Sequence, residues 1–170
     1  MSDQQDRYGF RLATKADFPF LREMLFEAAY WRTDVEKPPF EVGLARPDVA
    51  LILEDWGRRG DVAVVACSPE EELLGFAWYR FWTVEVHSYG FVDTGTPELG
   101  IAVREGHRRR GIGTGLLESL LAHARDLGIR QVSLSVEQDN PALALYEKLG
   151  FQQVSVVNNA WTMAIRLESD

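Results

Sequence analysis

Residues 108–117 read Arg108-Arg109-Arg110-Gly111-Ile112-Gly113-Thr114-Gly115-Leu116-Leu117, a loop with alternating glycines that runs directly into an apolar pattern. The pattern continues as one stripe at helical spacing: Ile112, Leu116, Leu117, Leu120, Leu121, Ala124 and Leu127. A stripe of this width is typical of an amphipathic helix that buries one face. The sequence therefore predicts a helix over residues 113–127, which Gly128 ends.

The beginning of this helix has the composition of an anion-binding site. Glycines let the backbone turn tightly, so that successive N–H groups point at one ligand beside the positive end of the helix dipole. Three arginines come immediately before: Arg108, Arg109 and Arg110. Together these features indicate a pyrophosphate site. In the alternative interpretation, the glycines only turn the chain and let the helix pack closely, and the arginines are solvated.

Two nucleotide-binding patterns are close to this loop. The spacing of Gly111, Gly113 and Gly115 resembles a dinucleotide fingerprint, and Glu137 lies where a ribose-binding acid is expected. The third glycine comes one residue early for that fingerprint. A nucleoside-triphosphate loop is excluded, because no lysine followed by serine or threonine is present.

Outward from the loop, the pattern predicts an α/β (mixed α+β) chain. Strands are expected at residues 8–12, 61–68, 73–84, 98–103, 132–136, 151–157 and 161–167. Helices are expected from Phe18 to Tyr30 and at residues 48–56, 113–127 and 141–149, with a loop between the first two. Thr14 and Asp17 resemble a capping box before the first helix. This order predicts a mixed sheet with helices on both faces.

Length and composition favour one domain over residues 1–170. With a net charge of −8, no run of eighteen apolar residues and no N-terminal signal pattern, we expect a cytoplasmic protein that binds neither nucleic acid nor membrane. Cys67 is the single cysteine, and His87, His107 and His123 lack the spacing of metal ligands, so no metal is expected.

The segment resembles motif A of the GCN5-related N-acetyltransferase (GNAT) superfamily, whose pattern of Arg or Gln, two residues, Gly, any residue and Gly or Ala is matched from Arg108 to Gly113. A second family segment, Asn-x-x-Ala-x-x-x-Tyr followed by Gly-Phe, resembles residues 140–151, from Asn140 through Tyr146 to Phe151. Here alanine stands one position away from its usual place. The resemblance covers residues 98–151 and implies a mostly antiparallel sheet of six or seven strands.

The resemblance also implies which residues bind acetyl-CoA, the acetyl-donor cosubstrate. The pantetheine arm is expected along the strand residues Ile101, Ala102 and Val103. The pyrophosphate is expected at Arg108, Arg109, Arg110, Gly111, Ile112, Gly113, Thr114 and Gly115. Asn140 would bind the cofactor or a nearby backbone group, and Tyr146 would lie beside the sulfur. Asn140 could equally serve as a helix cap before Pro141, and both roles are compatible.

The chemistry requires a proton acceptor, because an amine with a pKa of about 10.4 is mostly protonated near neutral pH. We expect Glu98, at the start of the cofactor-binding strand, to accept that proton directly or through a water. Tyr146 would donate a hydrogen bond to the departing thiolate. The competing interpretations are a solvated strand-end glutamate and a tyrosine that only packs in the helix.

The predicted function is therefore an N-acetyltransferase that moves an acetyl group from acetyl-CoA to a primary amine of a small molecule, peptide or protein. Two alternatives remain: a CoA-binding sensor without turnover, and a dinucleotide-binding protein. The sequence leaves open the acceptor, the acyl length beyond acetyl and the oligomeric state, a homodimer included.

Overall fold

The computed structural model describes residues 7–168. The chain groups into two compact units. The first comprises the chain up to Trp78 together with Gly100–Leu120, and the second comprises Tyr79–Leu99 and the chain from Leu121 onward.

Seven strands follow one another in the hydrogen-bonded order β1-β2-β3-β4-β5-β7-β6. Their bounds are β1 Gly9–Leu12, β2 Val62–Cys67, β3 Leu73–Arg80, β4 Glu98–Val103, β5 Gln131–Glu137, β6 Gln152–Val157 and β7 Ala160–Arg166. The pairs β1–β2, β5–β7 and β6–β7 are antiparallel, and β4–β5 is parallel. The prediction of a mixed, mostly antiparallel sheet is confirmed.

The helices largely match the predicted ones. They are α1 Phe18–Ala29, α2 Phe40–Ala45, α3 Pro47–Leu53, α4 Ile112–Asp126 and α5 Ala142–Leu149, with a short 3-10 helix at Lys15–Asp17. Where the sequence predicted only a loop, the structure has α2. Its six residues are too few to show a helical period, so tertiary packing of Leu44, which is 4% exposed, stabilises it.

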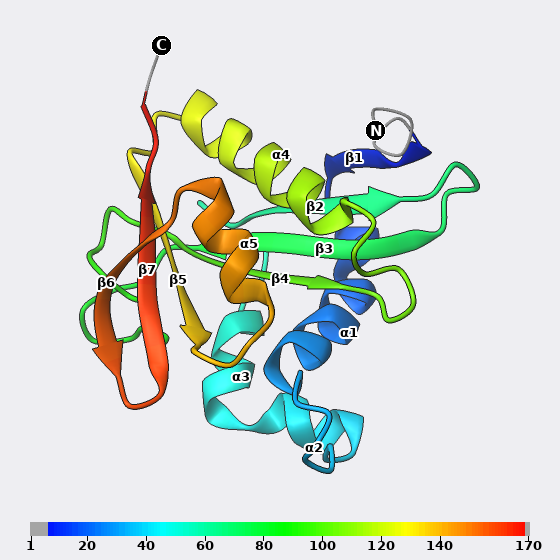
Figure 1. Ribbon diagram of the computed structural model, residues 1–170, viewed down its shortest axis with the longest axis horizontal. Coiled ribbons are helices and arrows are strands. Elements are labelled where there is room, and N and C mark those ends of the chain that lie inside the picture. Colours follow the sequence, from blue (N-terminus) through cyan, green and yellow to red (C-terminus); the bar gives the residue numbers. More distant parts are fainter. Residues whose placement is uncertain (1–6, 169–170) are drawn as a thin grey trace. The chain divides into compact units, whose positions relative to one another are not determined.

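In the first unit, α1 and α4 cover opposite faces of β3, and Figure 1 shows this strand between its neighbours β2 and β4. Phe76 meets Phe20 of α1 edge to face, with ring centroids 6.0 Å apart. A side chain at Gly75, the preceding residue, would instead meet Leu116 and Ile112 of α4. Since successive strand residues point to opposite faces, the prediction of helices on both faces holds in this unit.

The core between α1 and the sheet is aromatic and aliphatic. Its buried members include Phe20, Leu21, Met24, Leu25, Val65, Phe76, Trp78 and Ala102. Gly100 of β4 leaves room for the indole of Trp78, because a Cβ at this position would overlap that ring. Burial of large apolar side chains is the main favourable term in folding, so this cluster fixes α1 on the sheet.

A capping box precedes α1, as predicted from Thr14 and Asp17. The backbone N–H of Thr14 donates to the Asp17 carboxylate at 2.7 Å. Arg11 of β1 donates to both oxygens of the same carboxylate at 2.8 and 2.9 Å. This side chain therefore ties the first strand to the first helix.

Strand β3 ends earlier than expected. The connection between β2 and β3 is closed by the N–H of Ser68, which donates to the carbonyl of Glu72 at 2.9 Å. Strand β3 stops at Arg80, however, and not at Val84. The N–H of Thr83 donates to the carbonyl of Val86 at 3.0 Å, and this turn prevents the strand from continuing.

In the second unit, β7 lies between β5 and β6 and pairs antiparallel with both, beside α5, and β6 and β7 make the C-terminal hairpin drawn in orange and red in Figure 1. Strand β6 is exposed along its whole length and carries a bulge between Gln153 and Ser155. Gly150, at a φ of 107°, ends α5 before it. Among residues 7–168, no helix has the length and apolar character needed to cross a membrane.

Candidate functional site

The glycine loop in the first unit has an alternating backbone conformation. Arg109 and Gly111 both have positive φ angles, of 63° and 83°. When left-handed residues alternate with right-handed ones, successive backbone N–H groups point toward the same place. They then form a concave site that can bind an anion. The N–H of Gly115 donates to the carbonyl of Gly111 at 3.0 Å, as the first hydrogen bond of α4. The amides between them belong to the first helical turn, whose N–H groups have no carbonyl partner within the helix.

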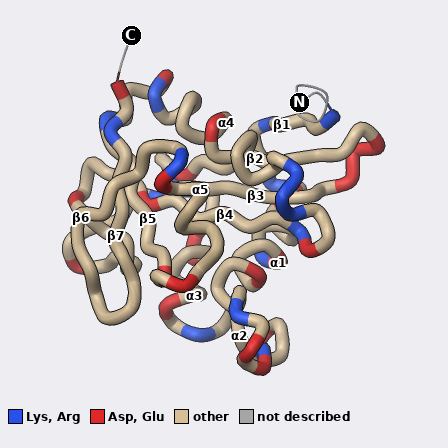
Figure 2. The backbone as a smooth tube through the Cα atoms, in the orientation of Figure 1, with Lys and Arg blue, Asp and Glu red and all other residues tan. Residues whose placement is uncertain are grey.

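Arg108 fixes the loop to the strand before it. Its Nε donates to the carbonyl of Val103 at 3.2 Å, and its Nη2 lies 3.7 Å from Glu27 of α1. The Arg108 side chain remains 50% exposed. Figure 2 shows basic residues gathered along this loop before α4. The predicted arginine cluster is therefore present at the surface and accessible to an anion.

The strand residues expected beside the pantetheine arm differ in their packing. The side chain of Ala102 is in the core, whereas Ile101 and Val103 are only partly buried. At the other side of the loop, Gly115 is buried against Phe10 of β1, since a Cβ there would overlap the Phe10 ring. Gly115 therefore has a packing role, as the structural interpretation of the glycines proposed.

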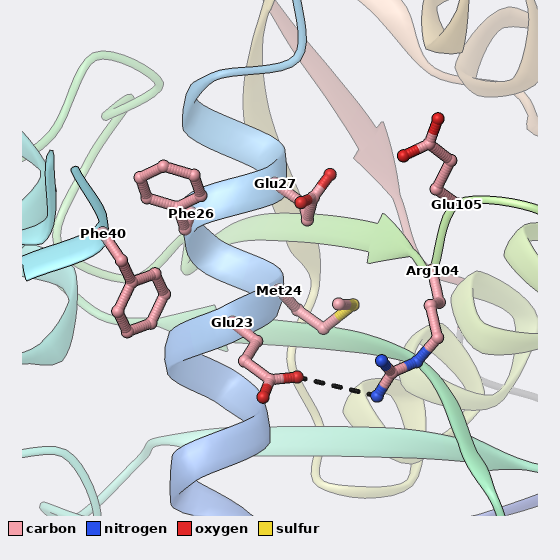
Figure 3. A pocket seen from close by; sticks show the side chains of 7 residues that line it. All are labelled: Glu23, Met24, Phe26, Glu27, Phe40, Arg104 and Glu105. Carbon is pink, nitrogen blue, oxygen red and sulfur yellow. Dashed lines mark ion pairs between the residues drawn. The ribbon is translucent and has the colours of Figure 1, made fainter. Parts of the chain in front are cut away.

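A cavity of about 430 Å³ opens beside the loop in the first unit. It is lined by Glu23, Met24, Phe26, Glu27, Phe40, Arg104 and Glu105 (Figure 3). Arg104 Nη2 lies 3.6 Å from Glu23, and the guanidinium lies over the Phe20 ring at 5.1 Å. No sequence pattern indicated this cavity, because its walls come from α1, the start of α2 and the residues directly after β4.

In the second unit, Asn140 acts as the cap of α5. Its Oδ1 accepts a hydrogen bond from the N–H of Ala142 at 2.9 Å, and its carbonyl accepts from the N–H of Leu143 at 3.1 Å. Pro141 precedes the helix, which begins one residue later than predicted. The helix-cap role of Asn140 is confirmed, and its role toward a cofactor stays a prediction.

Tyr146 is a buried residue of α5, with 7% of its surface exposed. Its ring meets Phe151 edge to face, with centroids 5.8 Å apart. Burial raises the pKa of its hydroxyl above the ordinary value of 10.0, because the tyrosinate would lose its hydration. Tyr146 is therefore a neutral hydrogen-bond donor over the physiological pH range.

Glu98 begins β4, and its carboxyl group accepts hydrogen bonds from three residues of the second unit, Trp82, Gly90 and Ser88. Trp82 Nε1 donates to Oε1 at 2.8 Å, and the N–H of Gly90 donates to Oε2 at 2.5 Å. Burial of the carboxyl raises its pKa, and the hydrogen bonds from Trp82, Gly90 and Ser88 offset part of that rise. A carboxylate with a raised pKa is suited to accept a proton near neutral pH. It is not the solvated strand-end glutamate of the competing interpretation.

The loop and its flanking strand belong to the first unit, and Glu98, Asn140 and Tyr146 belong to the second. Sequence reasoning missed the three donors to Glu98 and the serine behind them, Ser133. Only the alternation of Ser133 with apolar neighbours was visible in the sequence, and it indicated a strand and nothing more.

Among the described residues, no group of three or more His, Cys, Asp or Glu side chains is placed to hold a metal.

Comparisons with known proteins agree on one family. The model of the "Acetyltransferase (GNAT) family" matches residues 27–151. A mycothiol acetyltransferase of Corynebacterium glutamicum is 39% identical over 102 residues, which cover 57% of this chain and 30% of that protein. An L-methionine sulfoximine/L-methionine sulfone acetyltransferase of Pseudomonas paraeruginosa is 34% identical over 96 residues, covering 56% of this chain and 53% of that protein. The matched part is thus about half the length of one relative and less than a third of the other.

The fold is shared with solved structures at lower identity. The PaiA N-acetyltransferase of Thermoplasma acidophilum, determined in complex with coenzyme A, superposes with a TM-score of 0.71 at 16% identity. The similarity covers 94% of this chain and 99% of that one. At this identity the likeness concerns the fold.

Proposed function

The chain belongs to the acetyltransferase (GNAT) family, and from that premise we propose that it is an acetyl-CoA-dependent N-acetyltransferase whose acceptor is a primary amine. The observation that carries the proposal is the loop before α4, where left-handed Arg109 and Gly111 alternate with their neighbours beside three arginines. We also propose that residues 1–170 form one acetyltransferase domain. The boundaries between the two units fall inside β3, β4 and α4, whereas domain boundaries ordinarily fall in exposed linkers.

The loop residues fit the pyrophosphate of the donor. The first-turn amides Ile112, Gly113 and Thr114 supply N–H donors beside the positive end of the α4 dipole. The exposed side chains of Arg108, Arg109 and Arg110 add positive charge to an otherwise acidic protein. In this proposal Ile101, Ala102 and Val103 bind the pantetheine arm through their backbone groups, and Asn140 contributes a further hydrogen bond, as the family resemblance implies.

When bound, acetyl-CoA supplies a thioester whose carbonyl carbon an amine nitrogen attacks, forming the C–N bond and breaking the C–S bond. Glu98 accepts the proton that the nitrogen loses, directly or through a water. Tyr146 donates its hydroxyl hydrogen bond to the thiolate sulfur. Full transfer of its proton to the sulfur is uphill, because a tyrosine near pKa 10 is a weaker acid than a thiol near 8.5 and burial raises the pKa of Tyr146 further. Hydrogen bonding to the developing charge is the role that this environment supports.

For the acceptor, we propose a chemical class, a primary amine. The names of the two relatives contain small molecules, mycothiol in one and L-methionine sulfoximine and L-methionine sulfone in the other, and other relatives are named N-alpha-acetyltransferases. A small-molecule amine and a protein N-terminus therefore both belong in the test. The protein's net charge of −8 favours a cationic amine over an anionic one.

The test is a panel of small amines, of alcohols and thiols, and of peptides with free N-termini or lysines, supplied with acetyl-CoA and followed by release of free thiol and by mass spectrometry of each acceptor. We expect thiol release above the hydrolysis background with at least one amine, and the acetylated product by mass spectrometry. Binding of CoA without turnover on any acceptor would favour the sensor alternative. Binding of NAD(H) in preference to CoA would favour the dinucleotide-binding alternative, and activity confined to alcohols or thiols would contradict the amine proposal.

A further inference from the structure

Gly90 lies in the long connection between β3 and β4, and both of its backbone groups are bound. Its N–H donates to Glu98 Oε2 at 2.5 Å, and its carbonyl accepts a hydrogen bond from Ser133 Oγ at 2.7 Å. Glu98 and Ser133 are themselves partners in the parallel pairing of β4 with β5. The three residues thus form a closed arrangement, which we call the Gly90 clasp.

The clasp requires glycine at this position. A Cβ on Gly90 would lie 2.7 Å from the carbonyl carbon of Leu134 and 2.8 Å from the nitrogen of Ser135, and would also overlap the Glu98 carboxylate. The backbone of the connection is therefore pressed directly against β5. Side chains of ordinary size would push it away and break both hydrogen bonds of the clasp.

A second donor fixes the other oxygen of the carboxylate. Trp82, which is 4% exposed, donates its indole N–H to Glu98 Oε1 at 2.8 Å. Trp82 and Gly90 donate to different oxygens and so set the plane of the carboxylate, and the Ser88 side chain adds a third hydrogen bond. Three donors leave one of the four lone-pair sites of the carboxylate for an incoming proton. Ser133 is fully buried, so its hydroxyl hydrogen-bonds to the carbonyl of Gly90 and not to water.

We propose that Trp82 and Ser133 are positioning residues for the Glu98 carboxylate, Trp82 by direct contact and Ser133 through the backbone of Gly90. The inference rests on the proposed role of Glu98 as proton acceptor. It assigns a function to the connection between β3 and β4, namely to hold the base in one orientation. Misplacement of such a group by even a small distance lowers its efficiency strongly.

The electrostatic environment is consistent with this assignment. Burial opposes the charge of Glu98, while hydrogen bonds from Trp82, Gly90 and Ser88 and the neighbouring His87 favour it. His87 is stacked on Phe91 of the same connection, with ring centroids 4.4 Å apart. Loss of either positioning residue should therefore raise the pKa of Glu98 further, because less hydrogen bonding remains to stabilise the carboxylate.

The experiment measures the titration of Glu98 in the full chain without substrate. The carboxyl carbon signal of Glu98 is assigned by ¹³C NMR from its disappearance in Glu98→Gln, and its midpoint is compared in wild type, Trp82→Phe and Ser133→Ala. Ser155→Ala is the matched control, since Ser155 is an exposed strand serine of β6. We expect the midpoint to rise by about one pH unit in Trp82→Phe, less in Ser133→Ala, and not in Ser155→Ala.

The same variants are then assayed with the best amine, as kcat/KM against pH. The acid limb should move to higher pH in parallel with the NMR midpoint, while KM for acetyl-CoA stays near the wild-type value. Unchanged midpoints in both Trp82→Phe and Ser133→Ala, with folding checked by circular dichroism, would overturn the positioning inference. If Glu98 is not the proton acceptor, the result is different. The NMR midpoints of Glu98 still shift in Trp82→Phe and Ser133→Ala, but the acid limb of kcat/KM against pH is still present in Glu98→Gln.

Discussion

At Tyr146, the aromatic ring and the hydroxyl have separable roles. The ring packs against Phe151 inside the second unit, and the hydroxyl is the group that the proposed mechanism uses. Burial raises the pKa of this hydroxyl, so it stays protonated as a donor throughout the pH range of an assay. Removing the hydroxyl while keeping the ring therefore distinguishes catalysis from packing.

Tyr146→Phe should lower kcat by about 10²–10⁴-fold, the usual range for a positioned proton donor, with the affinity for acetyl-CoA nearly unchanged. The melting temperature should change little, because the phenyl ring still fills the same space. Single-turnover kinetics with the best amine measure the chemical step apart from product release. A wild-type single-turnover rate in the folded variant would mean that Tyr146 is structural.

At the scale of the element, the loop before α4 combines two uses of glycine. Gly115 is buried against Phe10 and serves packing, while Gly111 takes a φ of 83° that L side chains rarely adopt. Gly113 stands in the first turn of α4, where a backbone N–H is available to a ligand. Each glycine can therefore be tested for one property at a time.

Gly113→Pro should weaken acetyl-CoA binding at least tenfold, because proline removes one N–H donor while remaining compatible with the first turn of a helix. Gly113→Ala is the matched control, since alanine keeps the donor and is a residue that the family pattern accepts at this place. Isothermal calorimetry measures both affinities. If folded Gly113→Pro and Gly113→Ala bind acetyl-CoA with equal affinity, the backbone N–H of residue 113 does not contribute to the binding site.

The cap of α1 predicts a pH dependence of stability. Hydrogen bonding from Arg11 lowers the pKa of Asp17 below its ordinary value of 3.8, so the charged form is favoured in the folded state. The stabilisation is present above that ordinary value and is lost as the pH falls through the lowered one. Asp17→Asn should cost about 1 kcal/mol at pH 7, discounted because the Arg11 side chain is 46% exposed.

Urea unfolding at several pH values measures this effect. The difference in the free energy of unfolding between wild type and Asp17→Asn should shrink as the pH falls through the lowered pKa of Asp17, because the wild-type side chain then becomes neutral like that of asparagine. Glu70→Gln, in the exposed turn between β2 and β3, is the control and should leave stability unchanged. A difference that stays constant down to acid pH would show that the charge of Asp17 does not contribute.

At the scale of the whole molecule, the proposal of one domain predicts one cooperative unfolding transition. Trp31, Trp56 and Trp78 belong to the first unit, and Trp82 and Trp161 to the second. Variants that keep tryptophan in only one unit, with phenylalanine in the other, report each unit by fluorescence. In each variant, we expect the urea midpoint measured by fluorescence to equal the midpoint measured by circular dichroism.

Trp78→Phe and Trp82→Phe alter buried contacts, so each variant must be compared with its own backbone signal and not with wild type. Two separated fluorescence transitions in one variant, or a fluorescence midpoint that differs from the circular dichroism midpoint, would show that the units unfold independently. Residues 1–170 would then be two domains.

The sequence by itself determined the features that depend on neighbours along the chain. Glycine spacing and the apolar stripe predicted the loop and α4, polar alternation predicted β5, and Thr14 with Asp17 predicted the cap, because turns, periodicity and caps are set within a few residues. The tertiary structure alone decided α2, the early end of β3 and the surroundings of Glu98. Gly90 lies eight residues from Glu98 and forty-three from Ser133, and no local pattern marks contacts that exist only once β4 pairs with β5.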